Sequence, residues 1–369
     1  MIDYTSLSDF GLGWLEASGP HADIVLSTRV RLARNLQGHA FSNRMRDLER
    51  EQVFERVRRA CERSAIKGGI TLDLSALAPL SRKVLLERRL ISREMVGEGD
   101  SAPARGSGLV VGPRDSVGVM INEEDHLRLQ VLVSGLRLRE AHQTVDRLDE
   151  DLGSQLPFAF HQEFGFLTSC PTNVGTGLRA SILIHLPGLV LTKEIGRILQ
   201  GITQVGLTFR GLYGEGSEVV GNFFQVSNQT TLGKSEEDLV EHLEKMVTRV
   251  IQYETRARRV LLRDAPTVIE DKIWRAYGLL RYARSLSFDE VMNLLSGVRL
   301  GVSMNLLTGL RVYTLNKIMI YAQSAHLEQA AGRALSDGER DAHRAEYVRR
   351  ILSEEGDVEP DTPPEHDDD

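Results

Sequence analysis

The chain has 369 residues, of which 41% are hydrophobic and 26% are charged, a composition typical of a globular protein long enough for two domains. No apolar run approaches the roughly 20 residues that span a bilayer, and the N-terminus lacks the basic-then-apolar pattern of a signal peptide. We therefore expect a cytoplasmic protein without a membrane segment. Cys61 and Cys170 are too few for a disulfide framework.

The net charge of −7 comes from the end of the chain. Residues 354–369 contain nine acidic residues and neither lysine nor arginine, so the rest of the chain carries +2. Such a segment buries too little apolar surface to fold, and we expect a disordered acidic tail. The nearly neutral body lacks the basic stripe with interleaved aromatic residues that is typical of direct nucleic-acid binding.

Runs of β-branched residues bounded by glycine and proline predict strands, and apolar residues at helical spacing predict helices. In chain order we expect a helix at 46–64, a strand at 69–73, paired strands within 107–121, a helix at 137–153, a strand at 180–186, a helix at 189–201 and a strand at 222–227. This mixture predicts an α+β domain built on a sheet.

From Ser235 onward the pattern indicates helix after helix. Ser235 and Asp238 fit a capping box before a long amphipathic helix, and Ser287 with Glu290 fits a second capping pair. We therefore predict an α+β domain at 1–262, a helical domain at 263–353 and the acidic tail at 354–369.

Five arginines occur within short motifs spread over the α+β domain. A guanidinium donates two parallel hydrogen bonds to phosphate oxygens and stays charged at any working pH, so grouped arginines suit the binding of a polyphosphate. Arginine supplies most of the basic residues of this chain, and a single one is explained equally well by a solvated surface position. The five are Arg29, Arg31, Arg128, Arg179 and Arg210.

Two acidic motifs accompany the arginines. Glu123, Glu124 and Asp125 directly follow a predicted strand, and Glu215 lies between two glycines, a pattern typical of a mobile loop. Carboxylates can hold a cationic nitrogen group and accept a proton from it. A solvated turn also explains the first motif. A metal site with His126 is a further alternative, although consecutive residues rarely converge on one ion.

Cys170 precedes a Pro-Thr-Asn segment and a glycine-containing loop that leads towards Arg179. A single cysteine is most often a small buried hydrophobic residue. Neighbouring cations and loop amides, however, favour a thiolate. We therefore predict that Cys170 is a reactive thiol and that Cys61, on the apolar face of a helix, is inert.

The order and spacing of these motifs resemble the catalytic domain of the phosphagen kinases, or ATP:guanido phosphotransferases, over roughly residues 23–255. The resemblance implies a central, mostly antiparallel β-sheet flanked by helices, followed here by an all-α C-terminal domain. It implies a kinase that uses ATP and Mg²⁺, in which the five arginines bind the nucleotide. It also implies that Glu124 and Glu215 hold and deprotonate the guanidinium acceptor, with assistance from Cys170.

The chain departs from the small-molecule kinases of this family at two places. In those kinases an all-helical N-terminal domain encloses the free amino acid, whereas only 26 residues precede Ser27 here, so we expect an open acceptor side. Leu183 replaces the family's histidine after the third arginine motif. We therefore predict an ATP-dependent protein arginine kinase. The alternatives are a kinase for free arginine or a small guanidino compound, and a non-catalytic phosphoarginine-binding adaptor.

The C-terminal domain resembles that of the bacterial protein arginine kinases. The resemblance implies that an Arg-Asp-x-x-Arg-Ala motif binds phosphoarginine as an allosteric ligand and that the domain dimerises, although a solvated helix face also fits the spacing. It further implies a role in stress response and protein quality control, with proteins that expose arginines as substrates and an activator protein, a Clp ATPase and a stress-gene repressor as partners. The motif residues are Arg340, Asp341, Arg344 and Ala345.

Overall fold

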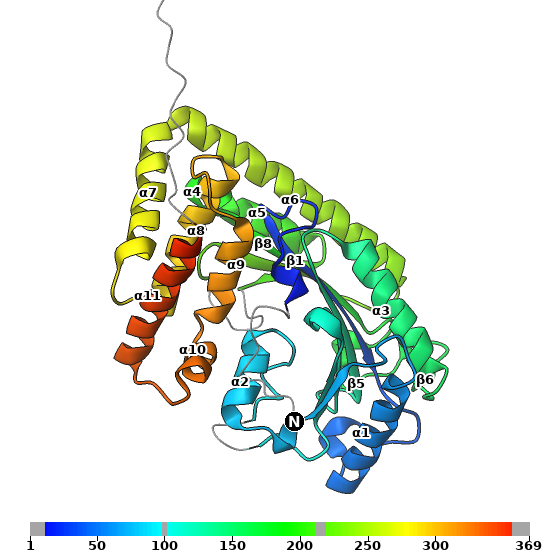
Figure 1. Ribbon diagram of the computed structural model, residues 1–369. Coiled ribbons are helices and arrows are strands. Elements are labelled where there is room, and N and C mark those ends of the chain that lie inside the picture. The colour runs from blue at the N-terminus through cyan, green and yellow to red at the C-terminus, as the bar shows by residue number, and fades with distance from the viewer. Residues whose placement is uncertain (1–11, 98–101, 212–218, 356–369) are drawn as a thin grey trace, which may run out of the picture.

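The computed structural model describes residues 12–97, 102–211 and 219–355. Its centre is an eight-stranded sheet, and every pair of neighbouring strands in it is antiparallel (Figure 1). Helices flank the sheet, and a helical region follows it in the chain. The predicted α+β class, with an antiparallel sheet and a helical C-terminal region, is therefore confirmed.

Strands β1 and β5, which the sequence patterns did not identify, lie at the middle of the sheet. Their arginines and glutamine alternate with valines and leucines, so each strand buries one apolar face and presents one polar face. In spatial order the strands are β2 (Ile70–Asp73), β3 (Gly108–Val111), β4 (Val117–Ile121), β5 (Leu127–Ser134), β1 (Val25–Arg34), β8 (Leu178–His185), β10 (Phe223–Asn228) and β9 (Leu207–Arg210), with a separate hairpin of β6 (Phe160–His161) and β7 (Gly165–Phe166).

Most helices begin close to where the sequence places them. The expected helix at 189–201 is instead two helices, because Lys193 between them adopts a positive φ of 61°. The helices before the C-terminal region are α1 (Asp47–Cys61), α2 (Pro79–Glu87), α3 (Leu138–Gly153), α4 (Pro187–Leu191), α5 (Ile195–Gln204) and α6 (Glu236–Asp264).

The long helix α6 begins at the predicted capping box, where the side chain of Ser235 accepts from the amide of Asp238 and Asp238 reciprocates. The predicted pair of Ser287 and Glu290 likewise caps a helix. The C-terminal helices are α7 (Pro266–Tyr282), α8 (Phe288–Ser303), α9 (Val312–Tyr321), α10 (Ser324–Ala331) and α11 (Asp337–Glu354). Among the helices that the structure describes, none combines the length and apolar character needed to cross a membrane.

The start of the expected acidic tail differs from the prediction. Glu354 is the last residue of α11, and Glu355 pairs with Arg311 at 2.6 Å and accepts a hydrogen bond from Thr314. Two of the nine tail acids are therefore part of the folded helical region. The remaining tail residues lie outside the described residues.

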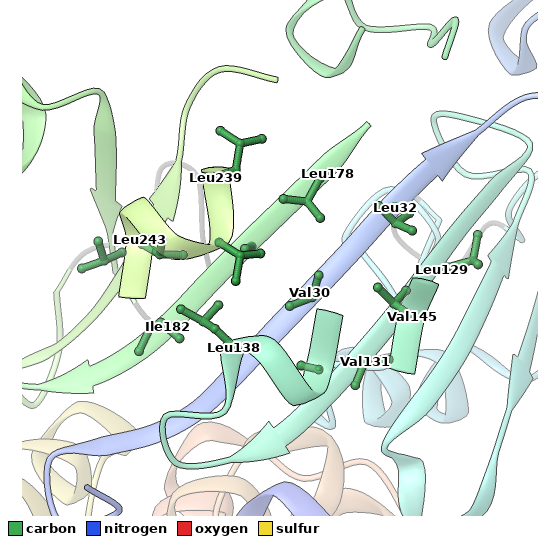
Figure 2. Packing of buried hydrophobic residues seen from close by; sticks show 14 of the residues in the cluster. Val30, Leu32, Leu129, Val131, Leu138, Val145, Leu178, Ile182, Leu239 and Leu243 are labelled. Atoms are coloured by element: carbon green, nitrogen blue, oxygen red, sulfur yellow. The ribbon is translucent and has the colours of Figure 1, made fainter. Parts of the chain in front are cut away.

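One face of the sheet is apolar and carries the main core of the molecule. Side chains of β1, β5 and β8 pack there against α3 and α6 (Figure 2). Burying one such side chain contributes about 1.5–3 kcal/mol, so this face drives the folding of the sheet. The labelled residues are Val30, Leu32, Leu129, Val131, Leu138, Val145, Leu178, Ile182, Leu239 and Leu243, each at most 2% exposed.

The opposite face of the sheet is divided into an apolar part and a polar part. Leu132, Leu183 and Phe223 form the apolar part and join the core of the C-terminal helices through Trp14 and Leu15. Further along the same strands this face bears arginine, glutamine and serine. The helical region therefore covers only one end of the face and leaves the polar end open to a ligand.

Replacing Leu243 by alanine tests the importance of the apolar face. Leu243 of α6 is fully buried, so Leu243→Ala should lower the free energy of unfolding by about 2–5 kcal/mol through lost burial and a cavity. Leu48→Ala is the matched control because Leu48 on α1 is 68% exposed, and its effect should stay within about 0.5 kcal/mol. Urea denaturation measures both. Equal destabilisation by the two changes would contradict this account of the core.

Candidate active site

Strand alternation brings all five expected arginines to one face of the sheet, and the fifth, Arg210 of β9, pairs there with Gln225 of β10. Arg29 and Arg31 are two residues apart on β1, so their side chains leave the sheet on the same side. Arg31 pairs in register with Arg179 of β8, and Ala33 of β1 pairs with Arg128 of β5. The sheet thus assembles a cationic surface from residues that are far apart in the sequence.

A cavity of about 850 Å³ lies over this surface. Its lining includes every expected site residue of the α+β domain that the structure describes. The carboxylate of Glu124 and the thiol of Cys170 therefore lie in the same cavity as the arginines. Glu215 belongs to residues 212–218, outside the described residues, so its position stays a prediction. The expected residues that line the cavity are Arg29, Arg31, Arg128, Arg179, Arg210, Glu124 and Cys170.

Burial and like charge both act on the arginines of β1. Burial is the main cause that lowers the pKa of Arg31 to about 9, and nearby Arg128 and Arg179 lower it further. The pKa of Arg29 is lowered as well, by burial first and then by the surrounding arginines. With a pKa of about 9, the guanidinium of Arg31 remains protonated at neutral pH. The cavity therefore concentrates positive charge that a bound polyphosphate would neutralise.

The turn after β4 has one buried side and one side that faces the cavity. Buried Asp125 accepts hydrogen bonds from Asn35 at 2.6 Å and from the amide of Ser169 at 2.7 Å. Buried His126 accepts from the amide of Leu36 at 2.9 Å through Nδ1, which requires the neutral ring. These two residues hold the turn in place. Across the described ranges no group of three or more histidine, cysteine or acidic residues could hold a metal ion, so the expected alternative of a metal cluster receives no support.

The side of the turn that faces the cavity supplies two carboxylates, those of Glu123 and Glu124. Arg128 contacts Glu123 at 2.5 Å and Glu124 at 3.0 Å. Burial raises the pKa of Glu124, and the charge of Arg128 partly offsets this effect. A carboxylate with a raised pKa is a better proton acceptor than an ordinary one. Glu124 is therefore suited to accept a proton beside the cationic surface.

Cys170 lies next to Glu124. A hydrogen bond between the two side chains lowers the pKa of Glu124, and the sulfur of Cys170 is 3.0 Å from the hydroxyl of Thr172. Cys170 is partly exposed to the cavity, whereas Cys61 is buried on α1. Burial raises the pKa of Cys61 to about 12. Cys170 is therefore the more accessible of the two thiols, and its reactivity stays a prediction.

Arg93 and Arg89 also line the cavity, and neither was identified from the sequence. Arg89 lies two residues after the end of α2. It donates to Gln225 of β10 at 3.3 Å, the same oxygen that Arg29 contacts at 3.1 Å. Its position follows from the loop after α2, which folds over the sheet. No motif surrounds Arg89 in the sequence, and in an arginine-rich chain composition does not single it out.

The expected phosphoarginine motif lies on α11, away from the cavity. Arg344 is buried, and it donates to the carbonyl groups of Ala322 and Leu286 at 2.8 Å each and to Asp341 at 2.5 Å. Arg340 is partly exposed and pairs with Asp337. Ala345 is fully buried. Arg344 thus joins three helical segments, and Arg340 is the more accessible of the two arginines.

Two family models match the chain. The model described as ATP:guanido phosphotransferase, C-terminal catalytic domain, matches residues 52–257, and the Protein-arginine kinase McsB C-terminal domain matches residues 266–362. The first covers more than half of the chain. The protein therefore belongs to the ATP:guanido phosphotransferase family.

Within this family the chain resembles protein-arginine kinases over most of its length. The chain is 46% identical to the Protein-arginine kinase of Moorella thermoacetica over 345 residues, which cover 92% of this chain and 97% of that protein. It is 43% identical to the Protein-arginine kinase of Bacillus cereus (strain G9842), over 92% of this chain and 95% of the relative.

Solved structures of two guanidino kinases share the fold. The duplicated taurocyamine kinase from Schistosoma mansoni, with bound transition state analog components, aligns with a TM-score of 0.58 at 26% identity. The alignment covers 68% of this chain and 37% of that chain. Lombricine kinase aligns with a TM-score of 0.56 at 24% identity, over 68% of this chain and 72% of its own. The expected phosphagen-kinase-like fold is confirmed.

Exchange of Arg31 for methionine should affect ligand binding and stability in opposite directions. Losing a paired, charge-assisted contact to phosphate should weaken MgATP binding about 10- to 100-fold. The folded state lowers the pKa of Arg31, so the protonated side chain destabilises the folded protein below about pH 9. This destabilisation decreases as the pH rises from there towards the ordinary pKa of arginine. The ligand-free variant should therefore melt no lower than the wild type at pH 7.

Calorimetric titration and thermal melting measure the two quantities. Arg275→Met on α7 is the control, because the side chain of Arg275 is 77% exposed and far from the cavity. Unchanged MgATP affinity in Arg31→Met, or a melting temperature clearly below that of the control, would contradict the proposed charge crowding.

Alkylation should distinguish the two thiols. Iodoacetamide should label Cys170 in the folded protein and leave Cys61 unlabelled, since Cys61 is 2% exposed and its pKa is about 12. Both should react after unfolding, as peptide mass spectrometry can show. Labelling of Cys170 should abolish kinase activity in proportion to its extent. Full labelling with full activity would show that the thiol does not face the reacting groups.

Proposed function

We propose that the protein is an ATP-dependent protein-arginine kinase that transfers the γ-phosphoryl group of ATP to the guanidinium of arginine side chains in proteins. One observation carries this proposal: a single cavity combines the arginine-lined face of the sheet with Glu124 and Cys170 at its edge. Membership of the ATP:guanido phosphotransferase family and resemblance to protein-arginine kinases over most of the chain support it.

The arginines of the cavity are proposed to bind the nucleotide phosphates. Phosphoryl transfer depends mainly on alignment of the reactants and on stabilisation of charge on the phosphoryl oxygens. Guanidinium groups from β1, β5, β8 and β9 approach the cavity from different strands, so they can contact several phosphate groups at once. The proposed ligands are Arg29, Arg31, Arg128, Arg179 and Arg210, with Arg89 as an additional cation.

Two carboxylates are proposed to bind the acceptor. An arginine guanidinium is a poor nucleophile because it is protonated, with a pKa above about 12. Glu124, and Glu215 by the family resemblance, would hold the group in plane and accept one proton from the attacking nitrogen. The new bond joins this nitrogen to the γ-phosphorus, the bond from that phosphorus to the bridging oxygen breaks, and ADP leaves with the bonding electrons.

Cys170 is proposed to assist electrostatically from beside Glu124. A thiolate near the guanidinium would stabilise its positive charge before transfer and orient the group towards the phosphorus. The contact of Cys170 with both Glu124 and Thr172 supports this position at the acceptor end of the cavity.

Mg²⁺ is proposed to enter bound to the phosphates of ATP. Mg²⁺ prefers oxygen ligands and usually binds through substrate phosphates with one or two carboxylates, so the phosphates of ATP would supply much of its coordination. When bound, the ion supplies charge neutralisation at the β- and γ-phosphates. The protein's own contribution is then the arginine surface that orients this complex.

The helical C-terminal region is proposed to regulate the kinase. Its resemblance to the corresponding domain of protein-arginine kinases supports phosphoarginine binding at Arg340, Asp341, Arg344 and Ala345. Because Arg344 is already held by carbonyl groups, Arg340 is the better placed to contact a phosphate. We further propose that this region dimerises and that phosphoarginine marks proteins for degradation in stress response. An activator protein, a Clp ATPase and a stress-gene repressor would be the partners.

Product analysis tests the proposed reaction. The protein should convert MgATP to ADP with an unfolded, arginine-rich protein as acceptor, and mass spectrometry at neutral pH should locate the phosphate on arginine. Glu124→Gln removes the proton acceptor with little change of shape and should lower kcat at least about 100-fold, the usual contribution of a general base.

Replacing the protein acceptor by free arginine distinguishes a protein-arginine kinase from a kinase for small guanidino compounds. We expect turnover with the polypeptide and little with free arginine, and Glu270→Gln on the distant helix α7 should retain full activity. Faster turnover of free arginine would favour the small-molecule kinase. Phosphate on serine or threonine would show that the acceptor has been misassigned.

A further inference from the structure

The last residue of α2 makes an ion pair and two backbone contacts with the C-terminal helical region. Glu87 accepts hydrogen bonds from the amides of Ala325 and His326 at 2.8 and 3.0 Å, and from Nδ1 of His326 at 2.6 Å. These donors belong to the first turn of α10, which lies beside α2 (Figure 1). The carboxylate therefore attaches the end of α2 to a helix that is more than 200 positions later in the sequence.

The two residues after Glu87 lead directly into the cavity. Buried Arg88 pairs with Asp115 at 2.8 Å. Arg89 lines the cavity, where it shares Gln225 with Arg29, and its carbonyl accepts from Gln130 of β5 at 3.0 Å. Glu87 and Arg89 thus connect α10 to the cationic surface through one short stretch of chain.

The backbone at Arg89 is in an unfavourable conformation. Its φ of 65° lies in the left-handed region, which a side chain with a Cβ atom adopts only under constraint. Such conformations persist where the surrounding structure holds them. On one side the constraint is the contact with Gln130, and on the other it is the attachment of α2 through Glu87.

We propose that Glu87 is a positioning residue for the nucleotide site, which by its contact with the first turn of α10 holds Arg89 against the phosphate-binding arginines. The proposal rests on the proposed function, because it takes the cavity to be the nucleotide site. Glu87 acts through Arg89 and does not itself line the cavity. The helical region is then a structural part of the nucleotide site.

The helix that receives Glu87 is itself fixed by α11. Arg344 donates to the carbonyl of Ala322, two residues before α10, and Arg340 lies 3.9 Å from Glu328 of α10. A continuous set of contacts therefore runs from α11 through α10 and Glu87 to Arg89. A shift of α11 would reach the nucleotide site by this route.

A double-mutant cycle with MgATP tests the proposal. Arg89→Ala should raise the Kd of MgATP about tenfold, the effect of losing one charge-assisted contact. Glu87→Gln keeps the shape of the side chain but loses its charge and one acceptor oxygen. It should raise the Kd of MgATP about fivefold, less than Arg89→Ala does, because Arg89 is displaced but still present. The double variant should bind like Arg89→Ala alone, because Glu87 has no further effect once its target is removed.

Two further variants separate positioning from general stability. His326→Asn retains an N–H donor near the place of Nδ1 and should bind MgATP like the wild type, whereas His326→Ala should resemble Glu87→Gln. Asp271→Asn, in an exposed pair on α7, is the control for a lost surface charge. In Glu87→Gln the KM for the protein acceptor should stay unchanged, a difference that simple destabilisation would not produce.

The outcomes distinguish this proposal from the proposed function. If Arg89→Ala binds MgATP as tightly as the wild type, the cavity is not the nucleotide site and both fail. If Arg89→Ala weakens binding and Glu87→Gln does not, the positioning role of Glu87 alone fails. Full additivity in the double variant also overturns it, since Glu87 would then act by another route.

Discussion

The mutual repulsion of several arginines on one face of an antiparallel sheet is the constraint on which the structure depends. The register of β1 with β5 and β8 places these cations side by side, and burial together with like charge lowers the pKa of Arg29 and Arg31. Such an arrangement costs stability in the absence of an anion. The apolar face of the same strands supplies the compensating burial against α3 and α6.

The two ends of the sheet face that bears the arginines make different contacts. At one end Leu132, Leu183 and Phe223 join the sheet to the C-terminal helices, and at the other the arginines line the cavity. The helical region also contacts Glu87 at the end of α2, two residues before Arg89 of the cavity. If Glu87 positions Arg89 as we propose, the helical region acts on both ends of this face.

Much of this arrangement could be predicted from the sequence, because the motifs around Arg29, Arg128 and Arg179 carry local information. The sheet class and the capping box at Ser235 were likewise visible. Arg89 could not be identified, because its role depends on a left-handed backbone position and on contacts with distant strands. The break at Lys193 was missed for a similar reason, since apolar periodicity continues through it.

The turn from Asn122 to Arg128 also shows what sequence patterns could not predict. Sequence alone left Asp125 and His126 open as metal ligands, and only the contacts with Asn35 and Leu36 show that they hold the turn. The neighbouring Glu124 faces the cavity instead. Alternation between buried and exposed side chains in a tight turn depends on the partners that the fold provides. Here they come from the segment after β1 and from Ser169.

The central claim is that the arginine surface binds the phosphates and that Glu124 faces the acceptor. A crystal structure with MgADP, nitrate as a planar substitute for the phosphoryl group, and an arginine-containing peptide tests it most directly. We predict that the phosphates contact Arg29, Arg31 and Arg179, with the peptide guanidinium against Glu124 and the nitrate between the two. Phosphates bound away from these arginines, or a guanidinium remote from Glu124, would contradict the account.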